Sequence, residues 1–177
     1  MTAPSPWVVR WAPLISRGTV LDVACGSGRH SNFFLGRNLK VVAVDRELQA
    51  IPGARFIQAD LEDGSPWPLP GMRFEGIVVT NYLNRLLMKT LQESLTDGGV
   101  LIYETFMQGN ERFGKPSNPA FLLRPGELLE TFEELSVKGF EEGEVEEPKP
   151  AMIQRLCAVR TGRDKMENSP VSTEFRT

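Results

Sequence analysis

Two glycines separated by one residue, Gly26 and Gly28, follow a short apolar run over residues 20–23. Glycine lets the backbone turn sharply and approach a ligand closely, and residues 27–31 are suited to open a helix whose free N–H groups face that ligand. The pattern therefore indicates a cradle for a nucleotide-like ligand. On this pattern alone, the alternative is a glycine-rich loop that only joins a strand to a helix.

A carboxylate, Asp45, ends a second apolar run over residues 41–44, and Arg46 follows it directly. The distance along the chain from the glycines to Asp45 is that of a βαβ unit, in which the second strand presents a carboxylate to the hydroxyls of a ribose. We therefore expect Asp45 to be a second anchor for the same ligand.

Polar residues also follow the third and fourth apolar runs, over 55–58 and 74–80. The third run leads into the acidic stretch 59–63, which is either a solvated loop or part of a site. The fourth run leads into Asn81 and Tyr82. Ligands of open α/β sheets lie outside the carboxyl ends of the strands, so we expect both side chains to point into an active site. For Tyr82 the alternative is packing at the start of a helix.

Three side chains are candidates for catalysis: Tyr82, Glu104 and His30. His30 is the only histidine and lies in the first turn of a predicted helix, where it could act as a general base or line a cofactor pocket. Glu104 follows the fifth apolar run, 100–103, and could serve as a general base. No group of histidine, cysteine and carboxylate residues has the spacing of metal ligands, so we expect no metal site.

The helices that must position these residues are predicted from hydrophobic periodicity. We expect one helix over residues 27–35 and a short one over 47–51. Leucines at helical spacing predict a third helix over 83–95, which Asp97-Gly98-Gly99 ends, and these leucines are expected to face the core.

The second half of the chain contains a predicted hairpin and an unusually long loop. Residues 135–145 and 151–160 are expected to form a closing antiparallel hairpin. The stretch 105–124 is longer than an ordinary strand-to-helix connection, and loops of this length are usually functional or disordered. Its phenylalanines and leucines favour an ordered lid that shapes the pocket for the substrate. We expect a single domain over residues 1–162 and a polar C-terminal tail over 163–177.

Length and composition restrict the class of protein. The chain has 177 residues, of which 41% are hydrophobic and 24% charged, and this fits one globular domain. A formal net charge of −3 argues against a nucleic-acid partner and favours a small-molecule substrate. With no membrane-length apolar run and a short polar N-terminus, we expect a cytoplasmic protein, a monomer or homodimer, that does not enter membranes. The two cysteines, Cys25 and Cys157, are expected to be reduced.

These motifs together resemble the class I S-adenosylmethionine (SAM)-dependent methyltransferases. The first motif of that family has an acidic residue followed by a glycine-rich turn, as in the stretch from Asp22 to Gly28, with Ala24 in place of the commoner first glycine. The resemblance covers residues 18–160. It implies an α/β, Rossmann-like, doubly wound sheet of seven mostly parallel strands with a C-terminal antiparallel hairpin. It also implies a transferase that uses SAM and releases S-adenosylhomocysteine (SAH).

The resemblance also implies a set of cofactor-binding residues. In the family, an acidic residue after the third strand accepts a hydrogen bond from the adenine amino group, and a neighbouring backbone N–H meets a ring nitrogen; Asp60 and Leu61 match those places. The implied binding residues are Asp22, Ala24, Cys25, Gly26, Gly28, Asp45, Arg46, Asp60, Leu61 and Asn81. The stretch 109–114 is similar to small bacterial methyltransferases of the tellurite-resistance type, which points to a bacterial enzyme with a thiol or chalcogen acceptor.

Two other functions are compatible with a cradle and a carboxylate in a βαβ unit. The first is an NAD(P)-dependent Rossmann oxidoreductase. Against it, Ser31 stands where the dinucleotide fingerprint has its third glycine, and no Tyr-x-x-x-Lys pattern is present. The second is a protein that binds SAM without catalysis, which only an acceptor assay distinguishes from an enzyme.

Overall fold

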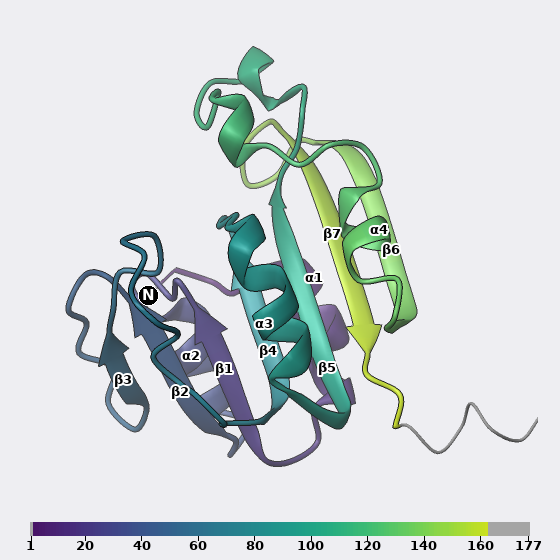
Figure 1. Ribbon diagram of the computed structural model, residues 1–177. Coiled ribbons are helices and arrows are strands. Elements are labelled where there is room, and N and C mark those ends of the chain that lie inside the picture. Colours follow the sequence, from purple (N-terminus) through teal and green to yellow (C-terminus); the bar gives the residue numbers. More distant parts are fainter. Residues whose placement is uncertain (1, 163–177) are drawn as a thin grey trace, which may run out of the picture.

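Seven strands form one sheet in the order β3-β2-β1-β4-β5-β7-β6 (Figure 1). The computed structural model describes residues 2–162, so the predicted tail over 163–177 lies outside the described residues. The strands are β1 (Thr19–Val23), β2 (Lys40–Asp45), β3 (Arg55–Gln58), β4 (Phe74–Thr80), β5 (Leu95–Phe106), β6 (Ser136–Val145) and β7 (Ala151–Val159). The first five are parallel, and β7 runs antiparallel to both β5 and β6. This topology confirms the predicted fold class.

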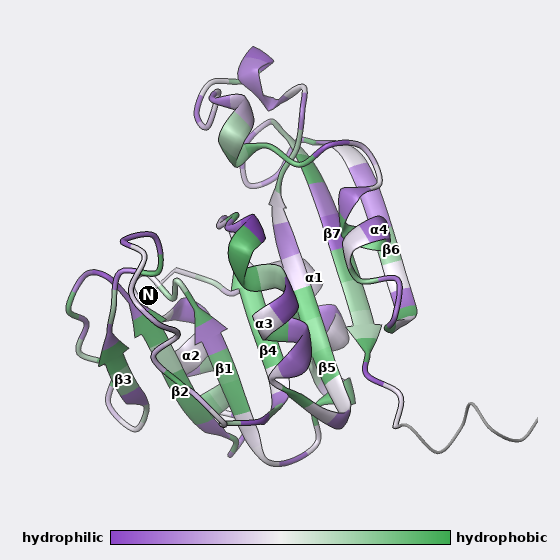
Figure 2. Ribbon diagram, viewed as in Figure 1, coloured by the Kyte–Doolittle hydropathy of each residue, from purple (hydrophilic) through white to green (hydrophobic). Residues whose placement is uncertain are grey.

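Helices cover both faces of the sheet (Figure 1). On one face lie α1 (Pro6–Trp11) and α2 (Arg29–Leu35), and on the other lie α3 (Met88–Glu93) and α4 (Glu127–Thr131). Because water reaches neither face of the central strands, these strands must be apolar on both sides. Figure 2 shows the apolar residues concentrated along them, and Val20, Leu21 and Val23 of β1 are all buried. None of the helices in residues 2–162 is long and apolar enough to cross a membrane.

The helix predicted over residues 47–51 is absent. The backbone there bends without forming a helical turn, and Leu48 is 75% exposed. The Oδ1 atom of Asp45 accepts a hydrogen bond from the Glu47 N–H at 2.9 Å, which offers the backbone a local alternative to a helix. Pro52 and Gly53 then limit the segment to a length that cannot offset the cost of helix nucleation.

The helix predicted over residues 83–95 is shorter and begins with a different geometry. A 3₁₀ turn, η2 (Arg85–Leu87), precedes α3, and the chain enters β5 at Leu95. Because a 3₁₀ turn has three residues per turn, it changes the phase of the leucine pattern. Leu86 is therefore 90% exposed, in contrast to the prediction that it faces the core, whereas Leu91 is buried.

Candidate functional site

The order of the strands reverses between β1 and β4, and the chain leaves the sheet there in left-handed backbone conformations. Ala24, which follows β1, has a φ of 51°, and Asn81, which follows β4, has a φ of 55°. Residues other than glycine rarely adopt positive φ, and such strain clusters at functional sites. Ligands of open α/β sheets also bind at the point of reversal. Both observations direct attention to the carboxyl ends of β1 and β4.

Hydrogen bonds attach the glycine-containing turn after β1 to the neighbouring strand. The Cys25 N–H donates to the carbonyl of Val44 at 3.0 Å, and the Gly26 N–H donates to Oδ2 of Asp45 at 2.8 Å. Gly28 is the N-cap of α2, and its φ of 80° suits glycine. The turn and the carboxylate predicted as two separate anchors are therefore in direct contact.

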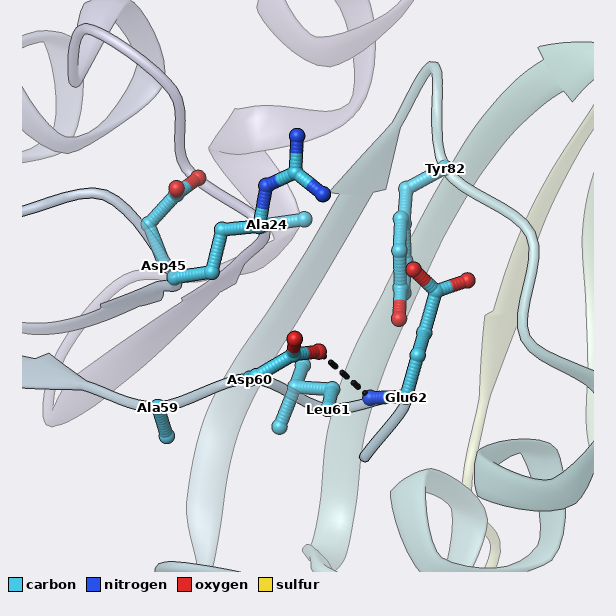
Figure 3. A pocket seen from close by; sticks show the side chains of 8 residues that line it. Ala24, Asp45, Ala59, Asp60, Leu61, Glu62 and Tyr82 are labelled. Atoms are coloured by element: carbon cyan, nitrogen blue, oxygen red, sulfur yellow. Dashed lines mark hydrogen bonds between the residues drawn. The ribbon is translucent and has the colours of Figure 1, made fainter. Parts of the chain in front are cut away.

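Asp45 retains acceptor capacity for a ligand. Each of its oxygens accepts one backbone hydrogen bond, Oδ2 from Gly26 and Oδ1 from Glu47. An ionised carboxylate has about four lone-pair sites, so about two remain. Asp45 also lines a pocket together with Ala24 and Arg46 (Figure 3). The carboxylate is thus placed to accept from two hydroxyls of a ligand in that pocket.

The pocket has a volume of about 190 Å³ and lies at the ends of β1, β2, β3 and β4 (Figure 3). Its lining consists of Ala24, Asp45, Arg46, Ala59, Asp60, Leu61, Glu62 and Tyr82. Three of these residues are acidic and one is basic, so the pocket favours a ligand that carries positive charge or hydrogen-bond donors. Ala59 and Glu62 belong to the acidic stretch 59–63, for which the sequence left two roles open, and neither was predicted as a binding residue.

Asp60 and Leu61 enter the pocket from the loop after β3. Oδ1 of Asp60 accepts a hydrogen bond from the Glu62 N–H at 2.9 Å, which holds the loop in a turn (Figure 3). A carboxylate in this position is an acceptor for an amino group, and the adjacent Leu61 side chain offers an apolar surface to a flat ring.

Tyr82 enters the pocket from the loop after β4. Its carbonyl accepts a hydrogen bond from the hydroxyl of Tyr103, at 2.9 Å, and Tyr103 is buried. Burial raises the pKa of Tyr82 above its ordinary value, and a hydrogen bond from Asn84 opposes this effect. The Tyr82 hydroxyl is therefore neutral near pH 7 and is available as a hydrogen-bond donor.

Asp22 and Cys25 support the turn without lining the pocket. Asp22 is 2% exposed and accepts a hydrogen bond from the Ser31 hydroxyl at 2.6 Å, which attaches β1 to α2. Burial raises the pKa of Asp22 to about 6. Burial also raises the pKa of the Cys25 thiol to about 12, so this cysteine is not a thiolate near neutral pH.

His30 does not line the pocket, in contrast to the prediction. It is 2% exposed, and its Nε2 accepts a hydrogen bond from the Ser5 N–H at 3.0 Å. Because Nε2 is an acceptor, the neutral ring carries its proton on Nδ1, which faces the Thr80 hydroxyl at 3.4 Å. Burial lowers the pKa of His30 to about 4. No ring nitrogen of His30 has a free lone pair for a general base.

Glu104 shares Ser5 with His30 as a hydrogen-bond partner, and it does not line the pocket. Its Oε1 accepts a hydrogen bond from the Ser5 hydroxyl at 2.8 Å, and its Oε2 is paired with Arg155. The N-terminal segment thus bonds to one polar atom of each predicted base, and Thr80 and Arg155 engage the others. In this conformation Tyr82 is the one candidate catalytic residue that lines the pocket.

The predicted lid, residues 105–124, contains two 3₁₀ turns, η3 (Asn110–Arg112) and η4 (Pro119–Phe121). Arg85 of η2 donates hydrogen bonds to the carbonyls of Ala120 and Leu122, both at 2.9 Å. It also pairs with Glu127, whose carboxylate is buried. The end of the lid is therefore anchored to η2, which directly follows the loop that carries Tyr82.

In residues 2–162, no cluster of three or more histidine, cysteine or carboxylate side chains is arranged to hold a metal ion. No protein-family model and no curated protein matches the sequence.

Solved structures match the chain in fold. TehB from Haemophilus influenzae superposes with a TM-score of 0.73 at 19% identity, over 91% of this chain and 64% of TehB. This chain therefore spans less than two thirds of the length of TehB. The 1,6-didemethyltoxoflavin-N1-methyltransferase from Burkholderia thailandensis, solved with 1,6-didemethyltoxoflavin and SAH, has a TM-score of 0.62 at 19% identity, over 88% of this chain and 76% of that one.

A third match is the N-methyltransferase NodS from Bradyrhizobium japonicum WM9 in complex with SAH, with a TM-score of 0.61 at 14% identity over 89% of both chains. These likenesses show that the chain has the fold of the class I SAM-dependent methyltransferases.

Proposed function

We propose that this chain is a SAM-dependent methyltransferase that acts on a small-molecule acceptor. The observation that carries the proposal is the convergence of Asp45 and Asp60, from the ends of two neighbouring strands, on one pocket beside the turn at Ala24. The pocket lies where the strand order of a methyltransferase fold reverses. Its donor and acceptor pattern matches the separate parts of a nucleoside.

The residues present fit SAM part by part. Asp45 has acceptor sites for two ribose hydroxyls, and Asp60 has one oxygen without a backbone partner for the adenine amino group. Leu61 supplies an apolar contact for the adenine ring. The turn from Ala24 to Gly28 lies beside the ribose site and would receive the amino-acid end.

When bound, SAM supplies an electrophilic methyl group on a sulfonium, which passes to the lone pair of an acceptor as the sulfonium carbon–sulfur bond breaks. The chain has to hold the acceptor in line with that bond and exclude water. Tyr82 faces the pocket with a neutral hydroxyl and is suited to orient the acceptor by donating a hydrogen bond. The lid anchored by Arg85 is suited to cover it.

We further propose that the acceptor is a thiol or another chalcogen nucleophile. Among the described residues that line the pocket, the only groups that could act as a base are the carboxylates of Asp45, Asp60 and Glu62, and the first two are assigned to the cofactor. His30 and Glu104 are engaged beneath the N-terminal segment. An acceptor that is already nucleophilic near neutral pH needs no general base, whereas an amine cation or a hydroxyl does. The Burkholderia thailandensis protein, which has the same fold, was solved with a small molecule, and this supports an acceptor of small size.

Calorimetric titration of the purified protein with SAM, SAH and NADH tests the cofactor. We expect SAM and SAH to bind and NADH not to bind. Binding of NADH alone would overturn the proposal in favour of an oxidoreductase. Methyl transfer from SAM to small thiols and to chalcogen oxyanions, followed by mass spectrometry, then tests the activity. Cofactor binding without transfer to any acceptor class would favour a SAM-binding protein that is not an enzyme.

A further inference from the structure

We propose that Asn84 is a positioning residue that ties the loop after β3 to the loop after β4 and so sets the width of the cofactor pocket. This inference rests on the proposed function of the pocket. In the sheet, β2 and β1 lie between β3 and β4, so strand pairing does not bring the two loops together. A side chain has to bridge them.

The contacts of Asn84 form that bridge. Its Nδ2 donates to the carbonyl of Leu61 at 2.9 Å and lies 3.5 Å from the hydroxyl of Tyr82. Its Oδ1 accepts from the Leu86 N–H at 3.1 Å and caps η2. Both polar atoms of the amide are used, one toward the pocket and one toward the helix that follows.

Leu61 and Tyr82, which the amide nitrogen of Asn84 contacts, line the pocket on two sides. Leu61 belongs to the surface proposed for adenine, and Tyr82 belongs to the acceptor side. The backbone of Tyr82 is already held by the hydroxyl of Tyr103. What Asn84 adds is control over the Tyr82 side chain and over the distance from Leu61 to it. Loss of these hydrogen bonds would therefore weaken cofactor binding and also make the position of the acceptor less well defined.

Two substitutions separate the tie from the cap. In Asn84→Ser, the hydroxyl can still cap η2, because serine is a good N-cap residue, but it is too short to reach Leu61. In Asn84→Asp, the side chain keeps its shape and its capping oxygen but cannot donate to the Leu61 carbonyl. Gln92→Ala is a matched control, because it removes an amide of α3 that donates its side-chain hydrogen bond to the exposed Glu134.

The first measurement is the affinity for SAH by calorimetry. We expect Asn84→Ser to weaken SAH binding about fivefold, the effect of one lost hydrogen bond, and Asn84→Asp to weaken it at least as much. Gln92→Ala should bind as the unmodified protein does. Thermal unfolding of each variant verifies that it is folded. If folded Asn84→Ser binds SAH with the same affinity as the unmodified protein, the proposed role of Asn84 is wrong.

The second measurement reports on Tyr82 without any cofactor. The chain has two tyrosines, and burial raises the pKa of the fully buried Tyr103 more strongly than that of Tyr82. Ultraviolet titration of tyrosinate therefore resolves Tyr82, and Tyr82→Phe verifies the assignment. We expect the Tyr82 transition to move to higher pH in Asn84→Ser, because the hydrogen bond from Asn84 lowers its pKa.

The two measurements distinguish the two proposals. If the unmodified protein does not bind SAH but the Tyr82 transition moves as expected, the proposed function fails and the bridge to Tyr82 stands. If SAH binds and neither the affinity nor the Tyr82 transition changes in the Asn84 variants, the function stands and the positioning role of Asn84 is wrong.

Discussion

Asp45 combines two roles in one side chain, because the carboxylate whose Oδ2 holds the glycine-containing turn also lines the pocket. A single carboxylate thereby sets the position of the turn and offers acceptors to a ligand. Tyr82 has a comparable double attachment, through its backbone to Tyr103 and through its side chain to Asn84. At the scale of residues, the site consists of groups that are already held in place by hydrogen bonds before a ligand arrives.

Replacement of Asp45 by alanine should weaken SAH binding by about 1.5–3 kcal/mol, because it removes charge-assisted hydrogen bonds to the ribose. Calorimetric titration measures the change. Asp45→Asn is the control for shape, because it keeps an acceptor oxygen but loses the charge, and we expect an intermediate affinity. Unchanged affinity in Asp45→Ala would show that this carboxylate does not bind the cofactor.

Replacement of Tyr82 by phenylalanine should leave SAH affinity nearly unchanged and lower the rate of methyl transfer. The ring that lines the pocket is retained, and only the hydroxyl that orients the acceptor is lost. Steady-state kinetics at saturating SAM, with binding measured separately, distinguishes the two effects. If transfer is as fast in Tyr82→Phe as in the unmodified protein, the tyrosine is a packing residue.

The turn between β1 and α2 is the element on which the pocket depends, and its two glycines have different surroundings. A Cβ added at Gly26 would have no atom within 4 Å, whereas one added at Gly28 would lie 2.6 Å from Cδ1 of Ile51. The φ of Gly26, 52°, is close to that of Ala24, 51°, so the turn already contains an alanine in this conformation. Gly26 therefore leaves space for a ligand, and Gly28 leaves space for the core.

Alanine substitutions at the two glycines should consequently affect different properties. Gly26→Ala should keep most of its stability and lose SAH affinity, because the new methyl group occupies space beside the cofactor. Gly28→Ala should lower the free energy of unfolding by about 1–3 kcal/mol more than Gly26→Ala, because of crowding against Ile51. Urea unfolding and calorimetry on both variants test the contrast, and similar losses of stability in the two would contradict it.

At the scale of the whole molecule, two buried titratable groups lower stability at opposite ends of the pH range, Asp22 at higher pH and His30 at lower pH. The pKa of Asp22 is raised to about 6 from 3.8, so its charged form opposes folding. This penalty is absent below about pH 4 and complete above about pH 6. The pKa of His30 is lowered to about 4 from 6.5, so its protonated form opposes folding. That penalty is absent above pH 6.5 and complete below about pH 4.

Single variants should reveal the two effects. Each of these two pKa shifts corresponds to about 3 kcal/mol in the free energy of unfolding. Asp22→Asn should be more stable than the unmodified protein at pH 7 by up to that amount, and the difference should vanish toward pH 4. For His30→Gln, the stability relative to the unmodified protein should rise as the pH falls from 6.5 to 4. Urea unfolding across this pH range measures both differences, and parallel pH profiles would contradict the assignment.

The sequence by itself determined most of the sheet. Residues 55–58 and 74–80 are strands at the predicted bounds, and the C-terminal hairpin is present. This success has a physical reason. A central parallel strand is buried on both faces and must be apolar throughout, so its pattern is local and visible in the chain. The spacing from the glycines to Asp45 is equally local, since it is the length of one βαβ unit.

Only the tertiary structure decided which polar side chains reach the pocket. His30 and Glu104 occupy plausible catalytic positions in the chain, yet Ser5, 25 residues from His30 and 99 residues from Glu104, engages them both. Asn84 meets Leu61 across 23 residues. A polar group keeps its lone pairs for a ligand only when no distant segment uses them. That outcome depends on which parts of the chain the fold brings together, and no local pattern encodes it.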